Sequence, residues 1–347
     1  MDEARLTPTN RFKPLKILAV VLTLCGVGVF AYFVYHVGVS EIWDGISRFG
    51  FAGFGVILFI YFIRICLRSW TWKLSIHEPF ELSMRDTIPA VLIGEALSST
   101  IPLGILISGT SKAIAVRNRI PLVAGLSSVA TENLFYSFTT GLFLIFGALV
   151  LLKGFDVTDS VELTLNILIG ALLFLLMLGL IMVIRQWHFV SWTCEWVYDH
   201  GLFRSLLKDG RDSIRRFEEL IYGFYRHYPR RFLPICLIQT VFHLLGVVEV
   251  WYVLNRIGGP NSTLISAFLL ESISRLITIL FKLIPFVIGV DEAGAQFVGD
   301  AVTLAVGVGV TIAIIRKGRI LFWAAVGMIL IIKRGLSIRE ISDTATG

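Results

Sequence analysis

The stretch LLESISRLITILFKLIPFVIGVDEAGAQFVGD, from Leu269 to Asp300, decides how this sequence folds. Apolar residues dominate it, yet it carries six charged side chains: Glu271, Arg275, Lys282, Asp291, Glu292 and Asp300. Pro285 and Gly289 interrupt the apolar run in the middle. A charged side chain inside a membrane costs about 2.5–3.5 kcal/mol or more, so it is rarely found there without a partner or a function. The pattern therefore predicts a broken or re-entrant helix that lines a polar cavity.

The composition of the whole chain indicates an integral membrane protein. Its 347 residues are 56% hydrophobic and only 16% charged, whereas soluble domains contain about 25% charged residues. Apolar runs long enough to cross a bilayer recur along the sequence, and no polar stretch is long enough to form a domain with its own core. We therefore expect an all-α, polytopic transmembrane helix bundle of about six to eight spans. It would form a single membrane domain over residues 1–347, with its core at residues 15–335.

The first expected span, Leu15–Val39, follows a short polar segment rich in basic residues. Its apolar run is longer than that of a signal peptide, so we expect a retained anchor with a cytoplasmic N-terminus. The later expected spans lie at residues 51–70, 121–152, 163–184, 232–254, 301–315 and 320–332. Basic residues and tryptophans mark the end of the second span, which is typical of an anchor at the inner interface: Arg64, Arg68, Trp70, Trp72 and Lys73.

A second broken segment, Ser83–Arg119, precedes the third expected span. Its apolar pieces are short, and five residues that disfavour a continuous helix separate them: Pro89, Gly94, Pro102, Gly104 and Gly109. Glu95 lies between the two prolines, and Lys112 follows the second one. We expect a re-entrant pair of half-helices here. One broken segment in each half of a chain is a pattern of pseudo-symmetric transporters.

Residues 185–231 form the only substantial polar region and are expected to be an amphipathic, basic, cytoplasmic segment. Four basic residues recur at helical spacing and share one face: Arg204, Lys208, Arg211 and Arg215. Two interpretations remain open. The segment is an ordinary positive inner loop, or it is an interfacial helix that binds anionic lipid head groups.

Several functional classes lack their sequence motifs. There is no phosphate-binding loop of an ATPase, no aspartate-rich run for a diphosphate with magnesium, and no nucleophile elbow. The four cysteines are scattered and no histidine pair has metal-ligand spacing. We therefore expect neither an enzyme nor a cofactor or metal. The net charge of +6 is explained by positive cytoplasmic loops, so a nucleic-acid partner is not expected either.

Charged residues within the apolar segments remain as the candidate site. The expected substrate path consists of Glu95, Lys112, Glu132, Glu271, Arg275, Lys282 and Glu292. Glu271 and Arg275 are one helical turn apart, so they either neutralise each other or meet a polar lipid head. After the break, Asp291 is expected to cap the next helix, while Glu292 is expected to lie in its first turn, where it suits the helix start, and to face the cavity.

Five short motifs, in order along the chain, resemble the transmembrane domain of the lysyl-phosphatidylglycerol synthase family. They are the Arg68/Trp70 end of the second span, IPLG (Ile101–Gly104) with Gly109 and Lys112, GLSSVATEN (Gly125–Asn133), IPFVIGVDEAG (Ile284–Gly294) and AIIRKGRILFWAAVG (Ala313–Gly327). This chain departs from the family at two places. It has Glu132-Asn133 where the family tends to have Glu-Arg, and it has fewer glycines between Pro285 and Glu292.

The resemblance implies a multi-pass protein of the cell (inner) membrane that moves, or helps to move, a polar or anionic lipid between leaflets. Its partners would be membrane lipids. The family's aminoacyl-transfer domain is not expected here, so lysine transfer to lipid is not expected. The alternative is a non-transporting membrane partner of an envelope-lipid or glycolipid biosynthetic enzyme. In that case the basic segment would matter more than the buried charges.

Overall fold

The computed structural model describes residues 39–100, 104–188, 191–194, 196, 204–257, 261–281 and 287–334, together with four isolated positions between residues 28 and 35. Over these residues the chain forms helices and turns and contains no strand. The all-α class is therefore confirmed. The first expected span, Leu15–Val39, lies largely outside the described residues.

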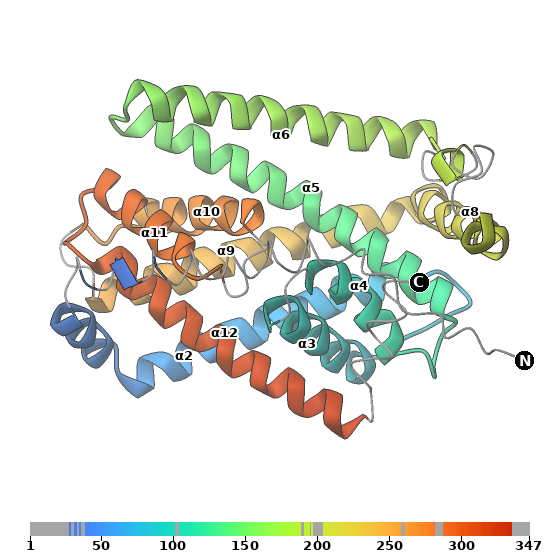
Figure 1. The fold of residues 1–347 in the computed structure, drawn as a ribbon, viewed down its shortest axis with the longest axis horizontal. Helices are drawn as coiled ribbons and strands as arrows, with labels where there is room; N and C mark the ends of the chain where they lie inside the picture. Colours follow the sequence, from blue (N-terminus) through green and yellow to red (C-terminus); the bar gives the residue numbers. More distant parts are fainter. Residues whose placement is uncertain are drawn as a thin grey trace, which may run out of the picture.

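Long helices run roughly along the long axis of the molecule (Figure 1). In chain order they are α2 (Val39–Leu74), α5 (Leu122–Gly154), α6 (Asp159–Arg185), α9 (Phe232–Ile257) and α12 (Val308–Lys333). Four described segments are long and apolar enough to cross a membrane: Ile42–Leu74, Leu122–Gly154, Asp159–Arg185 and Pro229–Ile257. The expected second to fifth spans lie within these four segments, except that the third was expected to start one residue earlier, at Pro121.

Both expected breaks coincide with helix ends. The first segment forms α3 (Met84–Thr100) and α4 (Gly104–Ala115), and the second forms α10 (Leu264–Leu280) and α11 (Val290–Ala301). Pro102, Lys282 and Pro285 lie outside the described residues. Gly289 precedes α11 with a φ of 83°, a backbone conformation that glycine adopts without steric cost. In Figure 1, α3 and α4 lie toward one end of the long axis and α10 and α11 toward the other.

Three of the expected helix-breaking residues do not break a helix. Pro89 and Gly94 lie within α3, and Gly109 lies within α4. Pro89 is in the second turn of α3, where its missing N–H leaves only one carbonyl of the helix start without a partner. Gly94 makes room for a neighbour, since a Cβ there would lie 2.8 Å from Lys112 Cγ. The expectation that these residues interrupt the helices was therefore wrong.

Helix α12 corrects a second expectation. Residues 301–315 and 320–332 were expected to be two spans separated by a basic turn, but one helix runs without interruption from Val308 to Lys333. Arg316, Lys317 and Arg319 lie in the middle of this helix and pair with carboxylates of neighbouring helices. These partners are distant in sequence. The basic cluster considered without them therefore predicts a loop.

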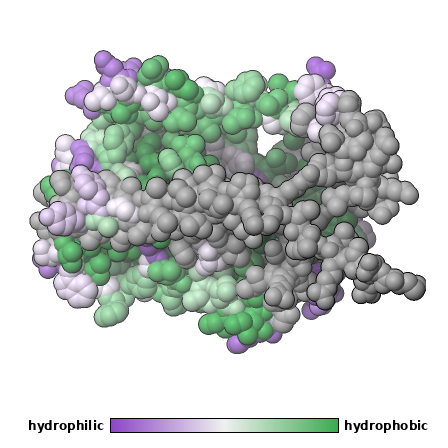
Figure 2. Space-filling view, viewed as in Figure 1, coloured by the Kyte–Doolittle hydropathy of each residue, from purple (hydrophilic) through white to green (hydrophobic). Residues whose placement is uncertain are grey.

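Apolar side chains cover much of the visible described surface, while hydrophilic ones gather mainly toward the two ends of the long axis (Figure 2). Helix α6 is the most exposed of the four candidate spans. Among its residues, Leu165 is buried. Exposed apolar side chains recur along it, including Ile167, Phe174 and Ile184. Such a surface is suited to contact with lipid tails. The chain is therefore a membrane protein by its architecture as well as its composition.

Helix α8 (Arg204–His227) forms where the basic amphipathic segment was expected. The structure does not describe the side chains of Arg204, Lys208 and Arg211. Arg215 is exposed and pairs with Glu219 at 3.4 Å. The inner side of α8 packs through Phe224 onto a cluster of buried and half-buried rings, which includes Phe135, Tyr225, Tyr228 and Phe232.

Candidate functional site

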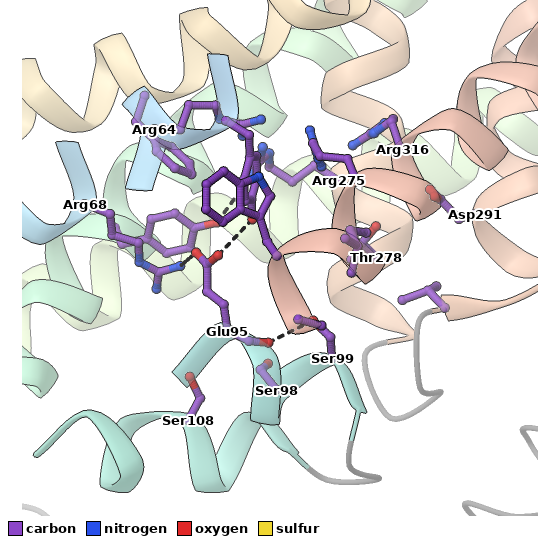
Figure 3. Close-up of a pocket in the computed structure, with 18 residues that line it drawn as sticks. Arg64, Arg68, Glu95, Ser98, Ser99, Ser108, Arg275, Thr278, Asp291 and Arg316 are labelled. Atoms are coloured by element: carbon purple, nitrogen blue, oxygen red, sulfur yellow. Dashed lines mark hydrogen bonds and ion pairs between the residues drawn. The ribbon is translucent and has the colours of Figure 1, made fainter. Parts of the chain in front are cut away.

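A cavity of about 230 Å³ lies between the two broken segments, and residues of both contribute to its lining (Figure 3). Ser98 and Ser99, near the end of α3, contribute to its wall on one side. Thr278, near the end of α10, and Val287, just before α11, contribute on the other. Both breaks therefore lie next to the same cavity, as one expects when half-helices surround a polar site.

Five arginines line this cavity, and they come from three helices. Arg64 and Arg68 belong to α2, Arg275 to α10, and Arg316 and Arg319 to α12. Among the described residues, two carboxylates line the cavity, Glu95 and Asp291. The inner surface of the cavity thus carries an excess of three positive charges, and Figure 3 shows Arg64, Arg275 and Arg316 gathered on the side opposite Ser98 and Ser108.

Glu271, one turn before Arg275 on α10, lies behind the lining and holds three of the arginines. Its Oε2 is 3.1 Å from Arg316 Nη2, and its Oε1 is 3.5 Å from Arg64 Nη2. Arg275 donates to the same Oε1, and its other terminal nitrogen donates to the Tyr136 hydroxyl at 3.0 Å. The expected pair of Glu271 and Arg275 forms. This pair is part of a larger network, because Glu271 contacts arginines from three helices: α2, α10 and α12.

Glu249 on α9 is the second shared carboxylate. Its Oε2 is 3.0 Å from Arg64 Nη1, and Arg319 donates to its Oε1. Aromatic rings hold the same guanidinium groups from other directions. Arg64 lies 4.5 Å from the ring centre of Phe242, and Arg319 lies 4.2 Å from that of Tyr61. The guanidinium groups are therefore fixed by charge and by cation–π contacts together.

A separate set of charges connects the N-terminal half to the cavity. Arg68 lies 3.7 Å from Glu95 and 3.4 Å from Glu132, while Lys112 lies 3.6 Å from the other oxygen of Glu132. The Tyr61 hydroxyl donates to Glu95 at 3.0 Å. Glu95 and Arg68 keep 19% and 17% of their side-chain exposure, whereas Lys112 and Glu132 are buried. The expected residues Glu95, Lys112 and Glu132 thus belong to one continuous cluster.

Glu132 has basic partners although its neighbour in sequence is not basic. The resemblance described above implies an arginine at the position of Asn133, and here Arg68 of α2 places a positive charge beside Glu132. Its Nη2 is 3.5 Å from Asn133 Oδ1, while its Nε contacts Glu132. Gln239 of α9 also donates to Glu132, at 3.3 Å. The departure in sequence is therefore compensated by a residue 64 positions earlier in the chain.

At the start of α11, Glu292 makes the capping contact that was expected of Asp291, and Asp291 lines the cavity as was expected of Glu292. Glu292 Oε2 accepts the backbone N–H of Gly289 at 2.8 Å, and its Oε1 lies 2.6 Å from Lys317 Nζ. Glu292 therefore caps the helix and ties it to α12. Asp291 lines the cavity instead, and its buried Oδ1 has no hydrogen-bond partner among the described residues.

One glycine makes the central network possible. A Cβ at Gly246 of α9 would lie 2.4 Å from Glu271 Oε1 and 3.2 Å from Arg64 Nη2. The small residue lets α9 approach α10 closely enough for both side chains to fit, as small residues do in membrane helix packing.

Sequence reasoning missed most of the arginines that line the cavity. Arg64 and Arg68 were assigned to an interfacial anchor, and Arg316 and Arg319 to a turn between spans. The signal that could have found them is helical spacing: Arg64 and Arg68 are one turn apart, as are Glu271 and Arg275. The basic residues of α8 lie on a helix that does not line the cavity. Within the described part of the chain, no group of three or more histidine, cysteine or acidic side chains is arranged to hold a metal ion.

Comparison with known proteins gives one result. The family model described as "Lysylphosphatidylglycerol synthase TM region" matches residues 16–327, which is most of the chain. No curated protein and no solved structure matches. The matched range includes both broken segments and every charged residue of the cavity described above.

Proposed function

Because this chain belongs to the lysylphosphatidylglycerol synthase transmembrane-region family, we propose that it is a lipid translocase. In this proposal the cavity binds the polar, anionic head group of a membrane lipid and carries it between leaflets. The observation that supports the proposal most directly is the set of five arginines that line a cavity between two broken helical segments. Charged groups are costly at membrane depth, so their concentration in one cavity favours a transport or binding role.

The arginines suit the phosphate of a lipid head. A guanidinium group binds phosphate oxygens through two parallel hydrogen bonds, which gives both strength and orientation. The cavity volume of about 230 Å³ is several times the ~30 Å³ that a water molecule occupies in the liquid. It therefore has room for a phosphate group and part of its substituent. Hydroxyl groups of Ser98, Ser99 and Thr278 would serve the uncharged part of the head.

Reconstitution tests the proposal. The purified protein in liposomes should move fluorescent anionic lipid between leaflets faster than protein-free liposomes do. Arg68→Gln and Arg316→Gln should each slow this movement, because each removes a guanidinium from the lining. Arg215→Gln, on the exposed face of α8, is the matched control and should leave the rate unchanged. Rates equal to those of empty liposomes for anionic, zwitterionic and polyprenyl lipids would contradict the proposal.

The alternative, a non-transporting partner of a lipid or glycolipid biosynthetic enzyme, is favoured by a different feature. Helix α8 packs on α5 through its aromatic face and exposes Arg215 and Arg216. In that case Arg215→Gln should alter the lipid composition of cells, while Arg68→Gln should not. The same two variants therefore separate the two functions.

A further inference from the structure

The charges around the cavity are not evenly matched. Among the described residues, the ion pairs of Arg64, Arg275, Arg316 and Arg319 are made with Glu249 and Glu271, and Asp291 adds a weaker electrostatic attraction at Arg316. We call these four residues the arginine cluster. With its two carboxylates, the cluster keeps two positive charges that no acidic side chain in the cluster balances.

Among the residues that the structure describes, the remaining charges near the cavity carry no positive excess. Arg68 and Lys112 face Glu95 and Glu132, so this group is neutral. Lys317 faces Asp291 and Glu292, which leaves one negative charge beside α11. The unbalanced positive charge is therefore concentrated in the arginine cluster, and Figure 3 shows Arg64, Arg275 and Arg316 of this cluster on one side of the cavity.

Unbalanced charge in a poorly solvated site requires a counter-ion, since the free energy of burying it is otherwise high. We infer that the cavity selects a phosphate group with two negative charges, such as a phosphate monoester or a diphosphate, over a phosphodiester, which carries one. This inference rests on the proposed function for the lipid as the source of the phosphate. The charge on the phosphate follows from the cluster itself.

The surrounding groups fix where the phosphate lies. Glu95 and Asp291 would repel a negative charge, so the phosphate is placed against the arginine cluster and away from these two carboxylates. The unpartnered Oδ1 of Asp291 accepts a hydroxyl or amine of the head group instead. The Trp323 indole N–H also lacks a partner among the described residues and lines the cavity, so it offers the ligand a further donor.

The test is a binding measurement on the full-length protein in detergent micelles. Phosphatidic acid, a phosphate monoester, is compared with phosphatidylglycerol of the same acyl chains, a phosphodiester. At about pH 8 the monoester should bind roughly tenfold more tightly, because it makes an additional ionic hydrogen-bonded contact. The second pKa of a phosphate monoester is about 6, so at about pH 5 most of this preference should disappear.

Arg316→Gln tests whether the cluster is responsible. The variant lowers the unbalanced charge by one, while Glu271 keeps Arg64 and Arg275 as partners and so remains neutralised. The preference for the monoester at about pH 8 should fall to about twofold or less. Arg316→Lys retains the charge and should retain the preference. Arg256→Gln, at an exposed position of α9 that does not line the cavity, is the control and should behave as the unmodified protein.

Competition with soluble anions identifies the source of the phosphate. A lipid site should need a large excess of inorganic phosphate or pyrophosphate to displace phosphatidic acid, because the acyl chains also contribute to binding. Displacement at equal concentration would assign the cavity to free phosphate and overturn the lipid assignment.

Two outcomes overturn the inference: equal affinity for the two lipids at about pH 8, or a preference that Arg316→Gln does not change. Both are separate from the failure of the proposed function. Selective binding without movement of lipid between leaflets would leave the inference in place and remove the translocase. Movement of lipid between leaflets without selective binding would leave the translocase in place and remove the inference.

Discussion

At the scale of single residues, Glu271 is the side chain on which the central network most depends, because three arginines contact it and it is 1% exposed. Glu271→Gln leaves those arginines with less negative charge than they have now. Removing one partner of a buried ion pair typically costs about 3–5 kcal/mol, so we expect a loss of stability of that order. Thermal unfolding in detergent measures it.

Glu219→Gln is the matched control for this prediction. Glu219 also pairs with an arginine, Arg215, but both side chains are more than half exposed. Exposed pairs contribute little, so the control variant should unfold at nearly the temperature of the unmodified protein. A Glu271→Gln protein as stable as the control would show that the network does not support the fold.

The residues of the cavity were predictable only where a charge interrupts an apolar run. Glu95, Lys112, Glu132, Glu271 and Arg275 stand out in this way, and the structure places them in the two charged groups beside the cavity. Arg64 and Arg68 lie beside tryptophans near the end of such a run, where the interfacial explanation is the usual one. Their partners are 27 to 207 positions away, so only the packing of the helices reveals their role.

At the scale of elements, the start of α11 offers a test that separates its two acidic residues. Glu292→Ala removes the side chain that accepts the Gly289 N–H and pairs with Lys317. Losing this cap should lower stability by about 1–2 kcal/mol or more. Asp291→Asn removes a charge from the cavity wall, so it should change head-group affinity with a smaller effect on stability. Thermal unfolding and lipid binding of both variants measure the two effects. A larger loss of stability in Asp291→Asn and a larger change of affinity in Glu292→Ala would contradict these roles.

The contact between α8 and the segment after α2 should weaken in acid. His77 packs edge-on against Phe224 of α8 and against Tyr228, the residue that follows this helix, and burial lowers the pKa of its imidazole below the usual value. The nearby His227 and Arg231 lower this pKa further. The unfolded chain therefore binds a proton that the folded chain disfavours, and stability falls as the pH drops below about 6.5. Unfolding temperatures measured across this range should show the fall.

His77→Phe gives the control for that expectation, since it keeps an aromatic ring but removes the titrating group. The variant should lose less stability than the unmodified protein over the same pH range. Equal losses in the two proteins would assign the effect to other groups.

Element boundaries were predictable where proline and glycine fall between apolar runs, as they do between α3 and α4 and between α10 and α11. The continuity of α12 was not predictable, because a basic cluster within an apolar run is the usual sign of a loop. The continuation of α12 depends on Glu249, Glu271 and Glu292, which neutralise its basic residues from other helices.

At the scale of the whole molecule, the two ends differ in charge. The end that contains α8 also contains basic residues at the termini of four other helices: Lys73, Arg185, Arg231 and Lys333. The opposite end carries Asp156, Asp159 and Glu162 around the turn between α5 and α6. Positive residues favour the cytoplasmic side. We therefore expect the α8 end, including the end of α12, to face the cytoplasm of the cell membrane.

Cysteine labelling checks this orientation. In a protein whose four native cysteines are replaced by serine, Ser160→Cys should react with a membrane-impermeant maleimide added to intact cells. Arg226→Cys, near the end of α8, should react only after the membrane is permeabilised. The reverse pattern would invert the assignment.

The continuity of α12 has a mechanical consequence. This helix packs against both α3 and α11, which belong to different broken segments. It also places Arg316 and Arg319 in the cavity between them. Because a helix without a break transmits tilt along its length, α3 and α11 cannot change their separation without tilting or bending α12. The guanidinium groups at its centre would then move relative to Glu249 and Glu271, so opening the cavity and releasing its anion would be a single event.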